Sequence, residues 1–299
     1  MTVKNPSNWE VLTTTRTSFS PASTRNSQGR NGLTFVGMGL WDHYGISLSG
    51  LRSAREADEV YAEYYTSIMP GLNVRWLERK IGKRITTLTR HDLEEDADRR
   101  IMNLARNKKL VLLVPGDPMA ATTHITLRLR ALELGIKTQI IHSASIFSAA
   151  PSLTGLQHYK FGKTVTIPLP REKFLPLSPY DVILENISRG LHTLVLLDLD
   201  VESGEYLTIN KALSLLARIE GMKRKNVFTG ERLFVGAAHV GSPNPIVKCG
   251  FINNLMNFDF GAPPHTLIVP GELHFMEAET LVKMFGAPRS ILTGRTSRD

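Results

Sequence analysis

Short apolar runs alternate with longer amphipathic stretches from Gly32 onward, and Gly/Pro-rich loops separate them. Apolar runs of this length are typical of buried strands, and apolar positions at helical spacing are typical of helices packed on a sheet. The alternation therefore predicts an α/β fold. In the first half we expect strands at 33–36, 110–114 and 137–141, a mixed segment at 59–65, and helices at 48–57, 93–105 and 123–134.

The second half repeats this texture. We expect strands at 165–169, 193–199, 233–238, 246–251 and 266–269, and helices at 179–189, 209–222 and 272–285. No repeat of 20 to 50 residues is visible, which argues against solenoids and propellers. The length suits two domains, so we expect α/β domains at 31–142 and 143–299.

Residues 1–30 are rich in Ser, Thr, Asn and Pro and show no apolar period. Such a segment cannot bury enough surface to offset its ordering entropy, so we expect a disordered extension. Its basic, acid-poor composition resembles an organelle transit peptide, which should however form an amphipathic helix. A tail without a targeting role, or an over-extended start of the chain, remains the favoured interpretation.

Composition and charge exclude several classes of protein. Apolar residues make up 42% and charged residues 21% of 299, as in folded soluble proteins. Much of the net charge of +8 lies in residues 1–30 and 289–299, so the body offers no clustered cations for direct nucleic-acid binding. No apolar run is long enough to span a membrane. The single Cys249 fits a packed thiol in a reducing cytoplasm.

The first expected strand runs into Gly37-Met38-Gly39, which invites a dinucleotide-binding interpretation. The full fingerprint needs a third glycine, but Asp42 stands there and would face a pyrophosphate. The glycines better suit a sharp turn beside an uncharged or zwitterionic ligand.

A second strand ends in Pro115-Gly116-Asp117-Pro118, a loop stiffened by two prolines. Open α/β sheets bind ligands beyond the carboxyl ends of their strands, where this loop lies. Asp117 could contact such a ligand or cap its own turn, and the local chemistry does not separate the two. We expect Thr122 or Thr123 to cap the helix that follows.

Other candidate chemistry is weaker. The nine histidines show no recognised metal-ligand spacing, so no metal site is expected, and no serine nucleophile elbow occurs. The acidic run 92–98 fits a solvated helix start better than paired catalytic carboxylates. Residues 222–225 fit a basic helix end.

Several runs together resemble the diphthine synthase family, in an order that covers most of residues 32–292. They include Leu33 to Leu40, Ala62-Glu63-Tyr64-Tyr65-Thr66-Ser67, the Pro115 loop with Ala121-Thr122-Thr123-His124, and Ile141 to Ile146. Further runs are Gly155-Leu156, Tyr159 to Lys163, Leu191 to Leu194, and Pro263-Pro264-His265.

The resemblance implies a homodimer of two α/β domains of the tetrapyrrole methylase type, with S-adenosyl-L-methionine bound between the domains and S-adenosyl-L-homocysteine as product. It implies methylation of a 3-amino-3-carboxypropyl-modified histidine on translation elongation factor 2, in diphthamide biosynthesis. Carried onto this chain, the family's cofactor contacts fall on Leu40, Asp117, Ala120, Ser145, Ile146, Leu196, Ala238 and His265. No catalytic base is assigned.

One departure concerns the substrate. The family commonly has an arginine where this chain has His239. If that arginine binds the substrate carboxylate, a histidine would be a weaker, pH-dependent substitute. Two other functions stay open at this point: a precorrin-type tetrapyrrole methyltransferase, and a non-catalytic nucleotide-binding module associated with translation.

Overall fold

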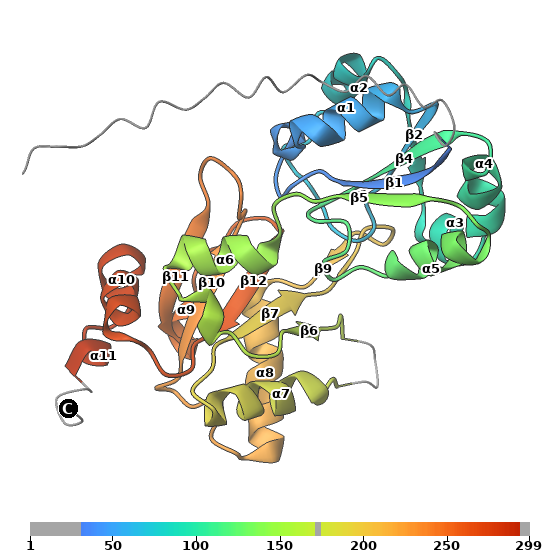
Figure 1. The fold of residues 1–299 in the computed structure, drawn as a ribbon. Coiled ribbons are helices and arrows are strands. Elements are labelled where there is room, and N and C mark those ends of the chain that lie inside the picture. The colour runs from blue at the N-terminus through green and yellow to red at the C-terminus, as the bar shows by residue number, and fades with distance from the viewer. Residues whose placement is uncertain (1–30, 171–174, 294–299) are drawn as a thin grey trace, which may run out of the picture. The chain divides into compact units, whose positions relative to one another are not determined.

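The computed structural model describes residues 31–170 and 175–293, and its strands form two five-stranded sheets and a small hairpin (Figure 1). The predicted disordered extension, residues 1–30, lies outside the described residues. The α/β fold class predicted from the sequence is confirmed. The proposed division at residue 142 stays a prediction.

The first sheet is entirely parallel, with the strand order β3-β2-β4-β1-β5. Its strands are β1 (Gly32–Gly37), β2 (Glu59–Glu63), β3 (Ile85–Leu88), β4 (Lys109–Val114) and β5 (Thr138–Ile141). The helical segments between them are α1 (Leu48–Glu56), α2 (Val74–Ile81), α3 (Arg90–Glu94), a π-helical turn at Asp98–Met102, α4 (Asn103–Ala105) and α5 (Ile125–Glu133).

Both faces of this sheet are buried, as parallel sheets require. On β4, Leu110, Leu112 and Val114 pack on one side with α4 and α5, whereas Val111 and Leu113 pack on the other with α1 and α2. Figure 1 shows the same division of the helices. Because helices cover both faces, a ligand can reach this sheet at the ends of its strands.

The second sheet is mixed, with the order β11-β10-β12-β7-β6 and only β6 and β7 parallel. Its strands are β6 (Val165–Ile167), β7 (Thr193–Leu197), β10 (Leu233–Ala238), β11 (Ile246–Phe251) and β12 (His265–Val269), and β8 (Leu199–Asp200) pairs with β9 (Glu205–Tyr206) as the hairpin. The helices are α6 (Ile146–Thr154), α7 (Ser178–Ser188), α8 (Ile209–Lys223), α9 (Ile252–Met256), α10 (Phe275–Phe285) and α11 (Ser290–Thr293).

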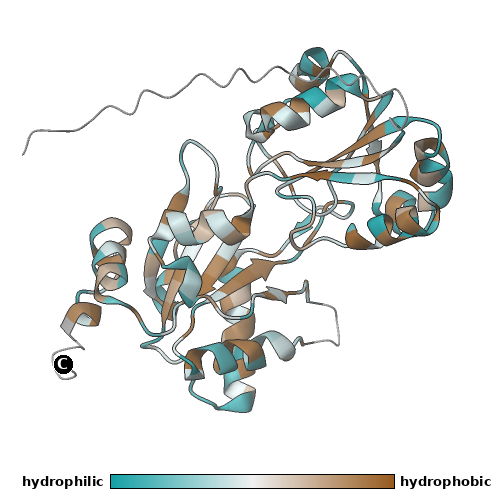
Figure 2. Cartoon of the chain, in the orientation of Figure 1, coloured by the Kyte–Doolittle hydropathy of each residue, from teal (hydrophilic) through white to brown (hydrophobic). Residues whose placement is uncertain are grey.

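Apolar residues of α7, α8 and α9 cover one face of the second sheet, and those of α6 and α10 cover the other. Strands of this sheet are largely brown in Figure 2, whereas the helices carry teal on their outer sides. Cys249 lies in this core, where burial raises the pKa of its thiol to about 12. The packed, unreactive thiol predicted from the sequence is therefore confirmed.

Several expected elements differ in extent, among them the strand expected at 165–169, which ends at Ile167. The helix expected at 93–105 is divided into α3, the π-helical turn and α4, although the backbone stays right-handed at Ala97 and Asn103. The strand expected at 193–199 ends at Leu197. The helix expected from 272 begins at Phe275, after the capping residue His274.

The capping prediction at the start of α5 was wrong. The residue that precedes the helix is His124, which makes no side-chain capping bond. The hydroxyl of Thr122 donates to the Pro118 carbonyl at 2.8 Å, and that of Thr123 donates to Glu94 at 2.9 Å. The Thr122 hydroxyl therefore binds the loop and the Thr123 hydroxyl binds α3, and neither caps the helix start.

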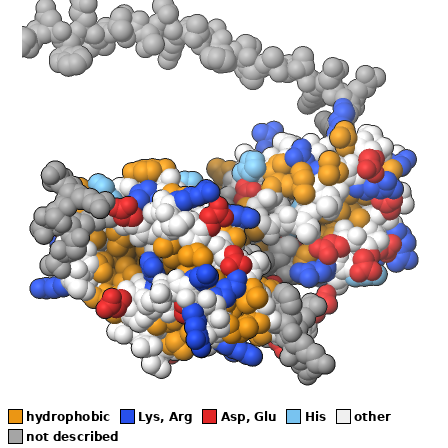
Figure 3. Space-filling model, turned by 90° about the horizontal axis from the view of Figure 1, so that it is seen from below, with side chains coloured by type: hydrophobic (Ala, Val, Ile, Leu, Met, Phe, Trp, Pro, Cys, Tyr) orange, Lys and Arg blue, Asp and Glu red, His pale blue; other side chains and the backbone are white. Residues whose placement is uncertain are grey.

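The acidic run lies at a helix start, as expected. Asp92 completes a capping box with Thr89 at the start of α3, where negative charge is favoured. On the face in Figure 3, basic, acidic and apolar side chains are interspersed rather than gathered by kind. Among the described residues, no helix combines the length and apolar character that membrane crossing needs.

Candidate functional site

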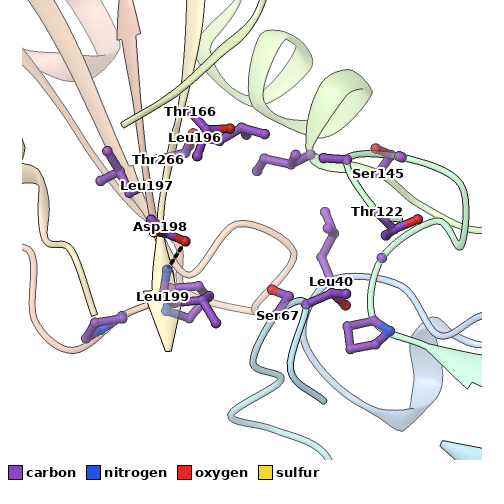
Figure 4. A pocket seen from close by; sticks show the side chains of 18 of the residues that line it. Leu40, Ser67, Thr122, Ser145, Thr166, Leu196, Leu197, Asp198, Leu199 and Thr266 are labelled. Carbon is purple, nitrogen blue, oxygen red and sulfur yellow. Dashed lines mark hydrogen bonds between the residues drawn. The ribbon is translucent and has the colours of Figure 1, made fainter. Parts of the chain in front are cut away.

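A pocket with a volume of about 290 Å³ is lined by residues that follow strands of both sheets. Loops after β1, β2 and β4 contribute one side, and β6, β7, the β8–β9 hairpin and the start of β12 contribute another. Figure 4 shows Leu40 and Ser67 of the first group across an open space from Thr166, Leu196 and Thr266 of the second. This volume is near the lower end of small-molecule sites.

Seven of the eight residues predicted from the family resemblance line this pocket. They are Leu40, Asp117, Ala120, Ser145, Ile146, Leu196 and His265. The eighth, Ala238, is not among the lining residues: it is fully buried and packs in the core on the α8 face of β10. Its neighbour Ala237 lines the pocket instead, since successive side chains on a strand point to opposite faces.

Backbone hydrogen bonds join the two glycine loops that form the floor. The Gly116 amide donates to the Gly39 carbonyl at 2.7 Å, and the Gly39 amide donates to the Gly116 carbonyl at 3.2 Å. A Cβ on Gly37 would lie 2.6 Å from the Gly116 carbonyl oxygen. Glycine is therefore needed at 37 for the close approach of the two loops.

Asp117 caps its own turn, one of the two roles left open by the sequence. Its Oδ1 accepts from the Met119 amide at 3.1 Å, and its Oδ2 accepts from the Ser143 amide at 3.3 Å. The same oxygen lies 2.7 Å from His142 Nδ1. The carboxylate thus connects the loop after β4 to the segment after β5 while it lines the pocket; contact with a cofactor stays a prediction.

Helix α6 begins at the pocket. Ser145 is its N-cap, and the Ser145 hydroxyl accepts from the Phe147 amide at 3.3 Å. Ser145 and Ile146 line the pocket, and Figure 4 shows Ser145 at the end of this helix. The partial positive charge of a helix N-terminus favours an anionic ligand group nearby.

His265 offers an unused polar atom. Its Nδ1 accepts from the Ile209 amide at 3.3 Å, so the neutral ring carries its proton on Nε2. Nε2 is buried and has no hydrogen-bond partner among the described residues. Burial lowers the pKa of His265, which keeps the ring neutral. A donor held in this state suits an acceptor on a bound ligand.

Known proteins resemble this chain in both sequence and structure. A family model described as Tetrapyrrole (Corrin/Porphyrin) Methylases matches residues 32–235. Diphthine synthases of Methanosarcina barkeri and Methanosarcina mazei are each 48% identical, the alignments covering 86% and 87% of this chain and 97% and 98% of theirs. A crystal structure of a diphthine synthase, 44% identical, superposes with a TM-score of 0.79 over 87% of this chain and 98% of its own. This chain belongs to the diphthine synthase family.

Membership in the diphthine synthase family makes the chain a methyltransferase of the tetrapyrrole methylase type. The curated relatives named above are diphthine synthases, so the tetrapyrrole-modifying alternative is not favoured. A non-catalytic binding module is likewise not favoured.

The part of the pocket that sequence reasoning missed carries most of its polar side chains. Tyr65, Thr66 and Ser67 follow β2, and the other missed residues include Arg90, Glu94, Thr166, Asp198 and Tyr206. The Tyr64 to Ser67 run was one of the motifs shared with the diphthine synthase family, and its place after a strand was the signal available. His239, by contrast, is not among the lining residues; its ring packs 5.0 Å from that of Trp41.

A buried carboxylate supports the Tyr65–Thr66 wall from behind. Glu63 is fully buried at the end of β2, and its Oε2 accepts from the amides of Tyr65 and Thr66 at 3.0 and 3.1 Å. His124 Nε2 lies 3.8 Å from the other oxygen. Burial raises the pKa of Glu63 to about 7, whereas burial lowers that of His124 to about 4. Near neutral pH the His124 ring is therefore neutral and the Glu63 carboxyl is only partly ionised.

The Glu63→Gln substitution should change how stability depends on pH. The folded-state pKa of about 7 exceeds the ordinary value of 4.5, so between these pH values the unfolded state releases a proton that the folded state keeps, and stability falls as pH rises. The stability of the wild type relative to Glu63→Gln should fall by about 3 kcal/mol as pH rises through this window, at 1.36 kcal/mol per pKa unit. Urea unfolding of both proteins from pH 4 to 8 measures it.

Glu59 on the same strand provides the control. Its pKa is lowered, chiefly by a hydrogen bond from Lys108. The advantage of wild type over Glu59→Gln should therefore shrink as pH falls below 4.5. If the difference in the free energy of unfolding between wild type and Glu63→Gln did not change with pH, the Glu63 carboxyl would have an ordinary pKa.

Proposed function

We propose that this protein transfers methyl groups from S-adenosyl-L-methionine to the amine of the 3-amino-3-carboxypropyl-modified histidine of translation elongation factor 2. Successive transfers to the same nitrogen would give the trimethylated product, diphthine. The observation that carries the proposal is that seven residues carried over from the family, from segments up to 225 positions apart, line a single pocket.

The chemistry of this pocket fits such a cofactor. Leu40, Ile146 and Leu196 supply apolar walls for an adenine ring and a methionine chain. The N-terminus of α6 suits the carboxylate of the methionine part, and the unpartnered Nε2–H of His265 suits an acceptor. When bound, S-adenosyl-L-methionine supplies an activated methyl group, whose S–C bond breaks as the N–C bond forms.

The residues of the chain then have two tasks. They hold the amine in line with the methyl group at near-attack distance, which removes entropy from the barrier. The pocket walls displace water, which disfavours the protonated amine and leaves its lone pair available. Each methylation releases a proton from nitrogen to solvent, except where the nitrogen ends as a quaternary ammonium. We assign no catalytic base.

We also propose a cytoplasmic location, in line with the single buried cysteine, and a homodimeric assembly, in line with the family. The protein partner is elongation factor 2.

Transfer of a labelled methyl group tests the function. Elongation factor 2 carrying the 3-amino-3-carboxypropyl histidine should gain label in the presence of this protein, whereas the unmodified factor should gain none. Binding of the factor without any transfer of label would contradict the proposal.

A further inference from the structure

One arginine, Arg90, lines the pocket, and it is not among the eight cofactor residues expected from the family resemblance. Arg90 is the only lysine or arginine among the described residues that line the pocket. It lies at the first position of α3, after the N-cap Thr89, and its side chain is exposed. None of the eight predicted cofactor residues lies on this helix.

A buried aromatic ring holds the guanidinium in place. The Arg90 Cζ lies 5.3 Å from the centre of the Tyr65 ring, a cation–π contact. Tyr65 is only 7% exposed, and the bond from its amide to Glu63 fixes its backbone. A guanidinium over an aromatic ring keeps N–H groups that can donate to another partner.

The acidic groups around Arg90 already have other partners. Glu94 accepts from the Thr123 hydroxyl at 2.9 Å, and Asp200 accepts from the amides of Glu202 and Ser203 at 3.0 and 3.3 Å. Glu63 is bonded to the backbone of the Tyr65 wall. The Arg90 side chain forms no hydrogen bond or ion pair with any described residue. An arginine edge that is paired with none of the carboxylates around it suits an incoming carboxylate.

We infer that Arg90 is the anchor for the α-carboxylate of the substrate, an amino-acid group whose amine and carboxylate share one carbon. This inference rests on the proposed function and adds the substrate side of the site. A bidentate Arg–carboxylate pair fixes both position and orientation. Because the amine is bonded to the carbon that bears the carboxylate, holding the carboxylate places the nitrogen as well.

Arg90 in this role removes the difficulty raised by His239. His239 does not line the pocket, and its Nε2 is bonded to the Ala262 carbonyl. The carboxylate would instead meet a group that stays charged at every physiological pH.

Binding of the protein substrate, with S-adenosyl-L-homocysteine present so that no methyl moves, tests the inference without relying on activity. Wild type should bind elongation factor 2 carrying the 3-amino-3-carboxypropyl group at least 10-fold more tightly than the unmodified factor. Arg90→Gln should lose that preference by about 10- to 100-fold, the range expected for hydrogen bonds to a charged group. Arg90→Lys should recover part of the preference, because lysine keeps the positive charge but cannot form the bidentate pair.

Two controls separate the possible failures. Arg99→Gln removes an exposed arginine that pairs with Asp96 and does not line the pocket, and it should keep the full preference. Calorimetry should give Arg90→Gln the wild-type affinity for S-adenosyl-L-homocysteine. An Arg90→Gln protein that still prefers the modified factor, or a wild type that never does, would overturn the anchor. Labelled methyl transfer by wild type in either case would leave the proposed function standing.

Discussion

Replacing Glu277 with alanine should destabilise the protein by about 3–5 kcal/mol, the cost of breaking a buried ion pair. The carboxylate is fully buried at the third position of α10 and lies 2.6 Å from Lys160 Nζ and 3.0 Å from His192 Nε2. The amides of Gln157 and His274 also donate to it, at 2.8 and 2.7 Å. Alanine would leave all four donors without this acceptor in or near the core.

Glu279 offers a matched control on the same helix. Its carboxylate is 42% exposed and pairs with Lys283 four residues on. An exposed pair of this kind contributes about 0.3–0.5 kcal/mol, so Glu279→Ala should unfold at nearly the wild-type urea concentration. Equal, small losses for both variants would show that the Glu277 network contributes little.

The Glu277 network should also shape the response to acid. Burial alone would raise the pKa of this carboxyl, but its hydrogen bonds, that from Lys160 above all, lower it to about 2. A lowered pKa adds stability above the ordinary value of 4.5, and this is lost as pH falls toward 2. The stability lost by wild type in this window should be smaller in Glu277→Ala.

Asp117→Ala should weaken binding of S-adenosyl-L-methionine by about 10- to 100-fold, or about 1.4–2.7 kcal/mol. The carboxylate lines the pocket and also accepts from two backbone amides, so its loss both removes a polar contact and loosens the loop. Asp117→Asn keeps one oxygen for the Met119 amide and should show the smaller part of the loss. Calorimetric titration of the folded variants measures both effects.

Asp42 is the matched control for Asp117. It also caps a turn after a strand of the first sheet, since its carboxylate accepts from the Tyr44 amide at 2.9 Å, but it does not line the pocket. Asp42→Ala should bind the cofactor within about twofold of wild type. A twofold or smaller change for Asp117→Ala as well would remove this residue from the cofactor site.

Strands β1 and β4 of the first sheet could be predicted well because each is a largely apolar run, the first ending at Gly37 and the second just before Pro115. Helix α2 and strand β3 carried weaker signals and were not predicted. Asn73 caps α2 and Gly82 ends it in a left-handed conformation, so start and stop signals were present but the apolar face is short. Helix α6 contains Pro151, a residue that sequence rules place outside helix interiors.

Seven of the eight residues carried over from the family line the pocket, in loops at strand ends, at the start of α6, in β7 and at the start of β12. Ala238 was the exception among these residues, since a one-residue step along β10 changes the face. The lining residues outside this set could not be predicted from the resemblance in this way. Arg90 joins the pocket only because α3 brings it over Tyr65, and Tyr206 only because the β8–β9 hairpin brings it there. Contacts between such distant segments leave no local pattern in the chain.

A crystal structure of the protein soaked with S-adenosyl-L-homocysteine is the most direct test of the site. We expect the ligand in the pocket, with its sulfur side open toward Arg90, its carboxylate near the start of α6, and His265 Nε2 within hydrogen-bond distance. Ligand bound elsewhere, or no ligand at saturating concentration, would contradict the account.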